Sequence, residues 1–101
     1  MTRETCEICR YRFEAEAMEP HHIVPQQITE EAGMPESQII RLCPNCHQEI
    51  HSWYRAKVPH IRYDIMTKQF VEKSCLEMIR EYQATFHGFA EYKREQRKRK
   101  R

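Results

Sequence analysis

The feature that most constrains how this chain folds is a set of four cysteines in two Cys-x-x-Cys pairs, Cys6 with Cys9 and Cys43 with Cys46. Disulfides do not persist in a reducing compartment, whereas two thiolate pairs that folding brings together supply the tetrahedral four-sulfur geometry that zinc prefers. A polar chain of 101 residues has little apolar surface to bury, so a structural metal would add stability that the core does not provide. We therefore expect the four thiolates to bind structural zinc. A redox pair or incidental buried thiols are the alternatives.

Charge and apolar content exclude several other classes of protein. The chain has 17 Lys and Arg, 15 Asp and Glu and 40% hydrophobic residues, which fits one small polar domain. No window approaches the roughly 20 apolar residues of a membrane span, and Met1 to Arg12 lacks the unbroken apolar stretch of a signal peptide. We expect an intracellular protein, cytoplasmic in location, with no membrane partner.

The first half of the chain predicts a β-hairpin followed by a helix. Ala17 to Val24 and Gln38 to Cys43 are short extended-looking runs, and Pro25 to Ser37 between them contains Pro, Gly and Glu, so we expect a hairpin with a long loop. From Pro44 the spacing becomes helical, and Pro59 ends the helix. The apolar side of this helix is formed by Ile50, Trp53 and Tyr54.

A second amphipathic helix is expected in the C-terminal part. Thr67 or Asp64 can cap its start and Gly88 suits its end. Its apolar positions, which step by three or four, are Val71, Cys75, Met78, Ile79, Tyr82 and Phe86. The simplest role for this stripe is core packing, with Cys75 as a small hydrophobe, and a homodimer contact is the alternative.

The chain is predicted to end in a basic tail. Residues 89–101 hold seven basic and two acidic residues, which leaves ten basic and thirteen acidic residues in 1–88. The tail comprises Lys93, Arg94 and Arg97 to Arg101. Such a run is either a solubilising end or an electrostatic arm for nucleic acid.

Four of the six histidines form two compact groups, His21 with His22 and His47 with His51. Residues i and i+4 project from one face of a helix, so His47 and His51 can reach a single metal ion. One more ligand from the hairpin would complete a site with three protein ligands. Of the two neighbours His21 and His22, one could bind the metal while the other stays free as a base, since imidazole titrates near neutral pH. Ordinary surface or core histidines are the alternative.

Three motifs in this sequence resemble those of the HNH endonuclease family in its zinc-stabilised form. They are Cys6-x-x-Cys9, His21-His22-Ile23-Val24-Pro25 and Leu42-Cys43-Pro44-Asn45-Cys46-His47, and the resemblance covers residues 6 to about 57. It implies an α+β fold with a small ββα-metal core, in which a hairpin precedes a helix and a four-cysteine zinc site supports both. We accordingly divide the chain into an HNH nuclease core (1–58), a C-terminal helical extension (59–88) and a basic tail (89–101).

The resemblance also implies a role for each clustered histidine. His21 aligns with the first metal ligand of the family and His22 with its general base. His47 aligns with the final histidine of the family motif, and His51 with a further ligand of the colicin-type nucleases. His21, His47 and His51 would then hold one catalytic divalent ion, which could be Mg²⁺, Mn²⁺, Ni²⁺ or Zn²⁺.

One position departs from the family pattern. Nine residues before His47, where the family has an Asn that ties down the loop of the base histidine, this chain has Gln38. Gln offers the same amide donors and acceptor on a longer stem, so Gln38 is the candidate for that role.

The resemblance implies a metal-dependent endonuclease that hydrolyses phosphodiester bonds, with DNA as its partner. The first alternative is a zinc-stabilised nucleic-acid-binding module without catalytic activity, in which Gln38 marks a lapsed site. The second is a small interaction protein whose long apolar helix docks a partner.

Overall fold

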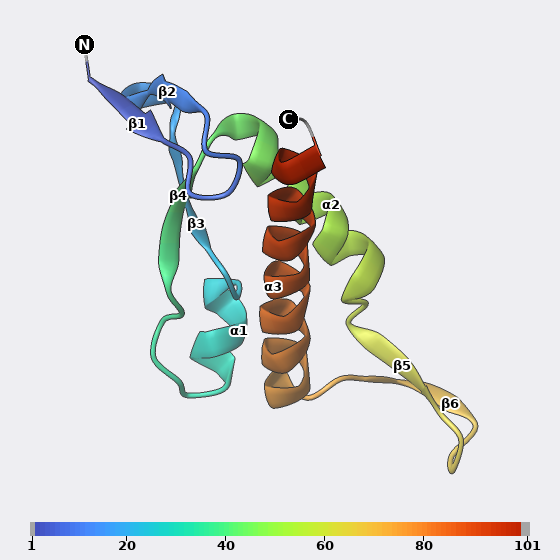
Figure 1. Ribbon diagram of the computed structural model, residues 1–101. Coiled ribbons are helices and arrows are strands. Elements are labelled where there is room, and N and C mark those ends of the chain that lie inside the picture. Colours follow the sequence, from blue (N-terminus) through green and yellow to red (C-terminus); the bar gives the residue numbers. More distant parts are fainter. Residues whose placement is uncertain (1, 100–101) are drawn as a thin grey trace.

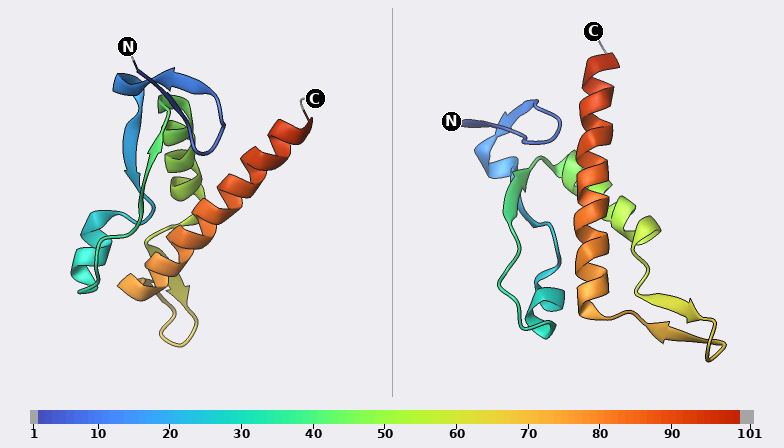
Figure 2. Two further views of the ribbon diagram at one scale, coloured as in Figure 1. Left: turned by 60° about the vertical axis from the view of Figure 1, so that its left-hand side comes forward. Right: turned by 60° about the horizontal axis from the view of Figure 1, so that its bottom comes forward.

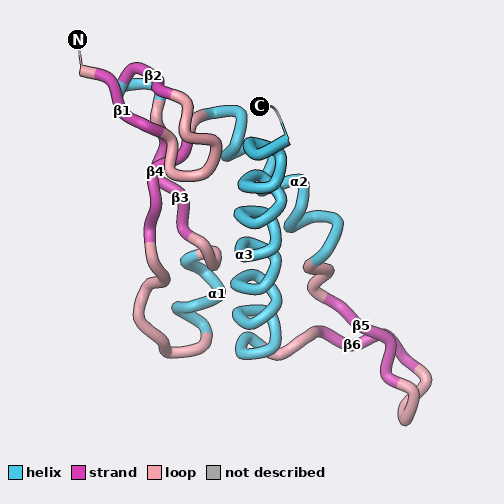
Figure 3. The backbone as a smooth tube through the Cα atoms, viewed as in Figure 1, coloured by secondary structure: helices cyan, strands magenta, loops and turns pink. Residues whose placement is uncertain are grey.

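The computed structural model describes residues 2–99, which form three antiparallel strand pairs and three α-helices (Figures 1 and 3). The first pair is β1 (Arg3–Thr5) with β2 (Arg12–Glu14), followed by a short 3-10 helix, η1 (Ala15–Ala17). The second pair is β3 (Glu19–His22) with β4 (Ile39–Leu42), and α1 (Gln26–Glu31) lies in the loop between them. After α2 (Pro44–Lys57) come the third pair, β5 (Ile61–Asp64) with β6 (Gln69–Glu72), and the long α3 (Cys75–Arg99).

The predicted hairpin and first helix are both present and form a ββα unit. In β4, Ile40 and Leu42 are buried and alternate with exposed neighbours, as expected for a strand with one face on the core. The Sγ of Cys43 accepts a hydrogen bond from the Cys46 N–H at 3.4 Å, and Pro44 occupies the first helical turn, where no N–H is needed. Helix α2 ends at Lys57, just before Pro59. The α+β class and the ββα core are thus confirmed.

The loop of this hairpin is more ordered than expected. It contains the short helix α1, which follows Pro25 and buries Ile28 and Thr29. The hydroxyl of Ser37 closes the loop, because it accepts from the Val24 N–H at 3.0 Å and donates to the Val24 carbonyl at 3.2 Å. These contacts fix the chain directly after the two adjacent histidines of β3.

The predicted start of the second helix was wrong, since residues 61–72 form the β5–β6 hairpin instead. Asp64 caps the turn of this hairpin rather than a helix, with its carboxylate accepting from the Met66 N–H at 3.0 Å. Val71 lies in β6, outside the helix. Helix α3 begins at Cys75, where the Ser74 hydroxyl accepts from the Glu77 N–H at 3.2 Å.

The predicted end of this helix at Gly88 was wrong as well. Helix α3 continues to Arg99, and the residue after the glycine, Phe89, is fully buried with its ring 5.4 Å from that of Trp53. Packing of this aromatic pair outweighs the helix-weakening tendency of glycine. Most of the predicted basic tail is therefore helical, while Lys100 and Arg101 lie outside the described residues.

The apolar stripe of α3 packs into the core, as the simpler expectation had it. Helix α3 lies against α2 and α1, and the β5–β6 hairpin points away from them (Figures 1 and 2). The buried positions of α3 are Met78, Ile79, Tyr82, Thr85 and Phe89. The stripe that suggested a homodimer contact thus has a partner within the chain, and the homodimer stays a prediction. In the part of the chain that the structure describes, no helix has the length and apolar character for crossing a membrane.

Candidate metal centres

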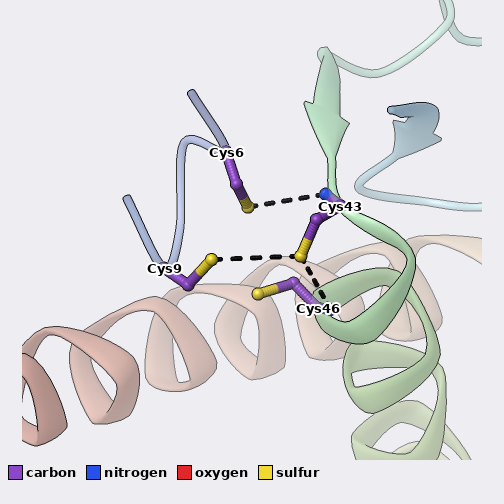
Figure 4. A group of neighbouring side chains, drawn as sticks. All are labelled: Cys6, Cys9, Cys43 and Cys46. Atoms are coloured by element: carbon purple, nitrogen blue, oxygen red, sulfur yellow. Dashed lines mark hydrogen bonds between the residues drawn. The ribbon is translucent and has the colours of Figure 1, made fainter. Parts of the chain in front are cut away.

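The four predicted cysteines converge at one end of the ββα unit. Cys6 and Cys9 lie in the turn between β1 and β2, Cys43 follows β4, and Cys46 lies in the first turn of α2. Their sulfurs point toward one another (Figure 4) and all lie within 4.8 Å of each other, with 3.9 Å between the Sγ atoms of Cys9 and Cys43. The four cysteines are therefore positioned to form a metal site.

Backbone geometry shapes the turn that carries the first cysteine pair, the knuckle turn of residues 6–11. The Cys6 N–H donates to the Tyr11 carbonyl at 2.9 Å, and the Arg10 N–H donates to the Cys6 carbonyl at 3.0 Å. Arg10 closes the turn in the left-handed region, with a φ of 68°. The Cys43 N–H points back at this turn and donates to the Sγ of Cys6 at 3.5 Å.

The protonation of these thiols indicates that the cluster suits a cation. A hydrogen bond from the Cys46 thiol lowers the pKa of Cys6 to about 4, and the same bond raises the pKa of Cys46. Burial raises the pKa of Cys9 to about 11. Without a cation, a first thiolate forms easily and opposes the ionisation of its neighbours. A divalent ion would remove this repulsion, and zinc fits four sulfur donors at these spacings.

A second cluster contains three of the predicted histidines. His21 comes from β3, while His47 and His51 lie one turn apart on α2, and each offers a ring nitrogen within 4.8 Å of the others. The Nε2 atoms of His47 and His51 are 3.2 Å apart. The spacing of four residues on a helix accounts for this pair, and the ββα packing adds the third ring.

Neighbouring side chains orient these rings. The Nδ1 of His47 lies 3.1 Å from a carboxylate oxygen of Glu19, and the Nε2 of His21 lies 3.1 Å from the hydroxyl of Tyr54. Glu19 was not singled out in the sequence and Tyr54 only as an apolar residue. Their spacing carried a signal, since Glu19 lies two residues before His21 on one strand face and Tyr54 lies seven residues after His47 on one helix face.

The local environment favours the neutral imidazole at two positions of this cluster, His21 and His51. Burial lowers the pKa of His21 to about 4, with the nearby His47 and His51 as further causes. Burial also lowers the pKa of His51. Neutral rings keep lone pairs for a metal ion, so the donors present fit a divalent cation.

The fourth histidine of the motif, His22, borders the same cleft. A cavity of about 200 Å³ is lined by His21, His22, His47, His51 and Tyr54 together with Pro20, Pro25 and Gln26. His22 is half-buried, and its Nε2 lies 3.5 Å from a carboxylate oxygen of Glu36. The two adjacent histidines thus differ in setting, with one buried among the other rings and the other partly open to solvent.

Gln38 lies in a different place from the cluster. It lines a separate cavity with Ile23 of the hairpin and with Gln83, Phe86 and His87 of α3. The backbone carbonyl of Gln38, rather than its side-chain amide, contacts the histidine segment: it accepts a hydrogen bond from the Ile23 N–H at 3.2 Å. The role expected of Gln38 therefore stays a prediction.

Comparison with known proteins agrees with this geometry. Residues 6–52 match the family described as HNH endonuclease, and this span includes all four cysteines and the three clustered histidines. The match confirms, over these residues, the resemblance of the motifs to the HNH endonuclease family. Searches of the curated proteins and of the solved structures found no match.

Proposed function

We propose that this chain is a metal-dependent endonuclease that hydrolyses DNA phosphodiester bonds at the histidine cleft. The observation that carries the proposal is that one cleft holds both a cluster of possible metal ligands and a separate histidine. Three histidine rings have nitrogens within 4.8 Å of one another, and a fourth histidine, His22, lines the same cleft and is half-buried. The family match over residues 6–52 supports the same activity.

His21, His47 and His51 would hold one divalent cation in this proposal. The ion would bind a phosphate oxygen and stabilise the negative charge that develops on the phosphate and on the leaving oxygen. Glu19 orients His47, because its carboxylate accepts a hydrogen bond from the Nδ1–H and leaves the lone pair of Nε2 to bind the metal. Imidazole ligands suit Zn²⁺, Ni²⁺ and Mn²⁺, while Mg²⁺ would rely more on oxygen ligands from substrate.

His22 is the proposed general base. Its imidazole takes the proton from the attacking water, and the carboxylate of Glu36 at 3.5 Å stabilises the imidazolium that this transfer creates. Partial exposure suits this role, because a base must reach both water and substrate. Gln38 would act at most through the backbone that follows His22, since its carbonyl bonds to the Ile23 N–H.

The four cysteines would hold structural zinc in the same proposal. That ion would join the knuckle turn to the start of α2, and His47 directly follows Cys46 on this helix. The structural ion would thereby position a ligand of the catalytic one. Cytoplasmic location and a homodimer remain predictions that accompany the proposal.

Incubation with supercoiled plasmid tests the activity directly. We expect nicked or linear DNA when a divalent ion is added to the zinc-loaded protein, and none without it. A protein that retards plasmid in a gel but leaves it intact with every metal would instead be a binding module without catalysis. A protein that neither cleaves nor binds plasmid would favour an interaction role.

A further inference from the structure

A second hollow lies between the knuckle turn and the C-terminal part of α3, away from the histidine cleft. Its volume is about 280 Å³, and it shares no lining residue with that cleft. The lining residues are Cys9, Arg10, Tyr11, Lys93, Gln96 and Arg97. The two contributing segments are far apart in the sequence, and a hydrogen bond from the Arg97 guanidinium to the Ile8 carbonyl joins them.

This hollow, which we call the knuckle pocket, is lined by three cationic side chains and by no carboxylate. Lys93 is paired with Glu49 at 2.7 Å, and Arg97 has further guanidinium donors beyond the bond to Ile8. Arg10 is exposed and has no ion pair or side-chain hydrogen bond among residues 2–99. Arg10 and Arg97 therefore present positive charge that no carboxylate pairs with among residues 2–99.

Uncharged groups in the knuckle pocket also suit an oxyanion. Tyr11 lines the pocket and is 61% exposed, so its hydroxyl can donate to a bound group and its ring can lie against one. The amide of Gln96 offers two more donors. Guanidinium groups, an ammonium, a phenol and an amide are the donors that proteins direct at phosphate oxygens.

We propose that the knuckle pocket binds a backbone phosphate of nucleic acid, separate from the phosphate cleaved at the histidines. The inference rests on the proposed function, which supplies DNA as the polyanion. It assigns to Arg10, Lys93 and Arg97 a fixed contact point, in place of a loose electrostatic tail. Such a contact sets where the duplex lies on the protein and is independent of base sequence.

The left-handed backbone at Arg10 makes a clean test possible. With a φ of 68°, this position suits glycine, so Arg10→Gly removes the charge without disturbing the turn. Arg12→Gln is the matched control, because Arg12 is exposed two residues away on β2 and does not line the pocket. Both variants lose one positive charge.

Binding of the full chain to a fluorescent DNA duplex, without added divalent metal, provides the main readout. For Arg10→Gly we expect roughly fivefold to tenfold weaker binding and a slope of log affinity against log salt that is smaller by about 0.9, the value for one phosphate contact. The control should lose less of both. An unchanged salt slope for Arg10→Gly would overturn the proposal. An unchanged salt slope together with weaker zinc retention by Arg10→Gly would also overturn it. The basic side chains of the pocket would then serve only to balance the charge of the cysteine thiolates.

Two further measurements separate the possible sources of phosphate and the two proposals. Inorganic phosphate could raise the melting temperature of the wild type more than that of Arg10→Gly while both proteins bind duplex equally well. That result would assign the pocket to a free anion and overturn the DNA contact. Plasmid cleavage by Arg12→Gln, which lies outside the pocket, should equal that of the wild type. A smaller salt slope without any wild-type cleavage would leave the pocket standing and reject the nuclease proposal.

Discussion

The hydroxyl of Tyr54 joins His21 to the backbone, because it lies 3.1 Å from the His21 Nε2 and donates to the Ile23 carbonyl at 2.8 Å. A phenol has one hydrogen, and a carbonyl can only accept, so this hydrogen belongs to the bond with Ile23. The hydroxyl must then accept from the Nε2–H of His21. This arrangement selects one tautomer and leaves the Nδ1 of His21 with the free lone pair.

Replacing Tyr54 by phenylalanine should therefore weaken metal binding at the histidine cluster. The variant keeps the buried ring but frees His21 to adopt the other tautomer and to rotate. Loss of such an orienting partner costs about tenfold or more in metal affinity. Calorimetric titration with Ni²⁺ measures the loss, and histidine nitrogen chemical shifts report the tautomer. Tyr82→Phe, which removes a phenol bonded to His60, is the control; equal affinities in both variants would contradict the tautomer argument.

The cysteine cluster should determine whether the domain folds. Cys43 is buried and lies among three other thiols, so Cys43→Ser should abolish zinc retention and unfold much of the chain, since metal binding is part of the folding free energy. Cys75→Ser should retain the metal and most of the stability, because Cys75 lies outside the cluster. Metal content and thermal melting of both variants test this. Small and similar losses in the two would argue against a structural zinc site.

Base and ligand roles should separate in the histidine variants. His22→Ala should lower the cleavage rate by a factor of about 100 or more and leave metal affinity nearly intact. His47→Ala should weaken metal binding itself, because it removes one of the three clustered rings. A nicking assay paired with calorimetry distinguishes the two effects. Wild-type cleavage by His22→Ala would reject the mechanism.

The buried ring of His21 should make stability fall in acid. Its pKa is lowered from 6.5 to about 4, so between these values the unfolded chain binds more protons than the folded one. Stability conferred by the neutral ring is therefore present above pH 6.5 and is lost as the pH falls toward 4. Between about pH 7 and pH 5 the loss should be about 2 kcal/mol.

Urea unfolding without added divalent metal measures this loss. The pH dependence should be smaller in His21→Gln than in the wild type, while the exposed His87→Gln should behave as the wild type does. The cysteine cluster is common to all three proteins and cancels in the comparison. Identical pH dependence in wild type and His21→Gln would mean that His21 is not the titrating group.

The ββα core was predictable because its signals are local. Pro44 and Pro59 bracket α2, and the spacing of His47 and His51 places both on one helix face. The third ring of the cluster, His21, was anticipated from the family resemblance and not from this spacing. Glu19 and Tyr54, which orient the rings, lie on the predicted strand and helix, but only the packing of these two elements brings them to their partners.

The C-terminal half was less predictable because two patterns overlap there. Ile61 and Tyr63 alternate with polar residues as in a strand, yet Val71 also lies four residues before Cys75, in step with the helical stripe. Gly88 looked like a helix end, and only the burial of Phe89 against Trp53 explains why α3 continues. Local propensity gave way to tertiary packing in this segment.

The contact between Arg97 and Ile8 spans 89 positions of the sequence, and this separation has a consequence for synthesis on the ribosome. The knuckle turn, the β3–β4 hairpin and α2 leave the exit tunnel first, whereas Phe86, which stacks on His21, and Phe89 emerge roughly a few seconds later at usual elongation rates. During that interval Tyr54 lacks its contact with Tyr82 of α3, whose ring centroid lies 4.7 Å from that of Tyr54. The nascent chain therefore carries an uncovered histidine cluster until α3 has been made. The ring of His21 becomes covered by Phe86 only late in translation.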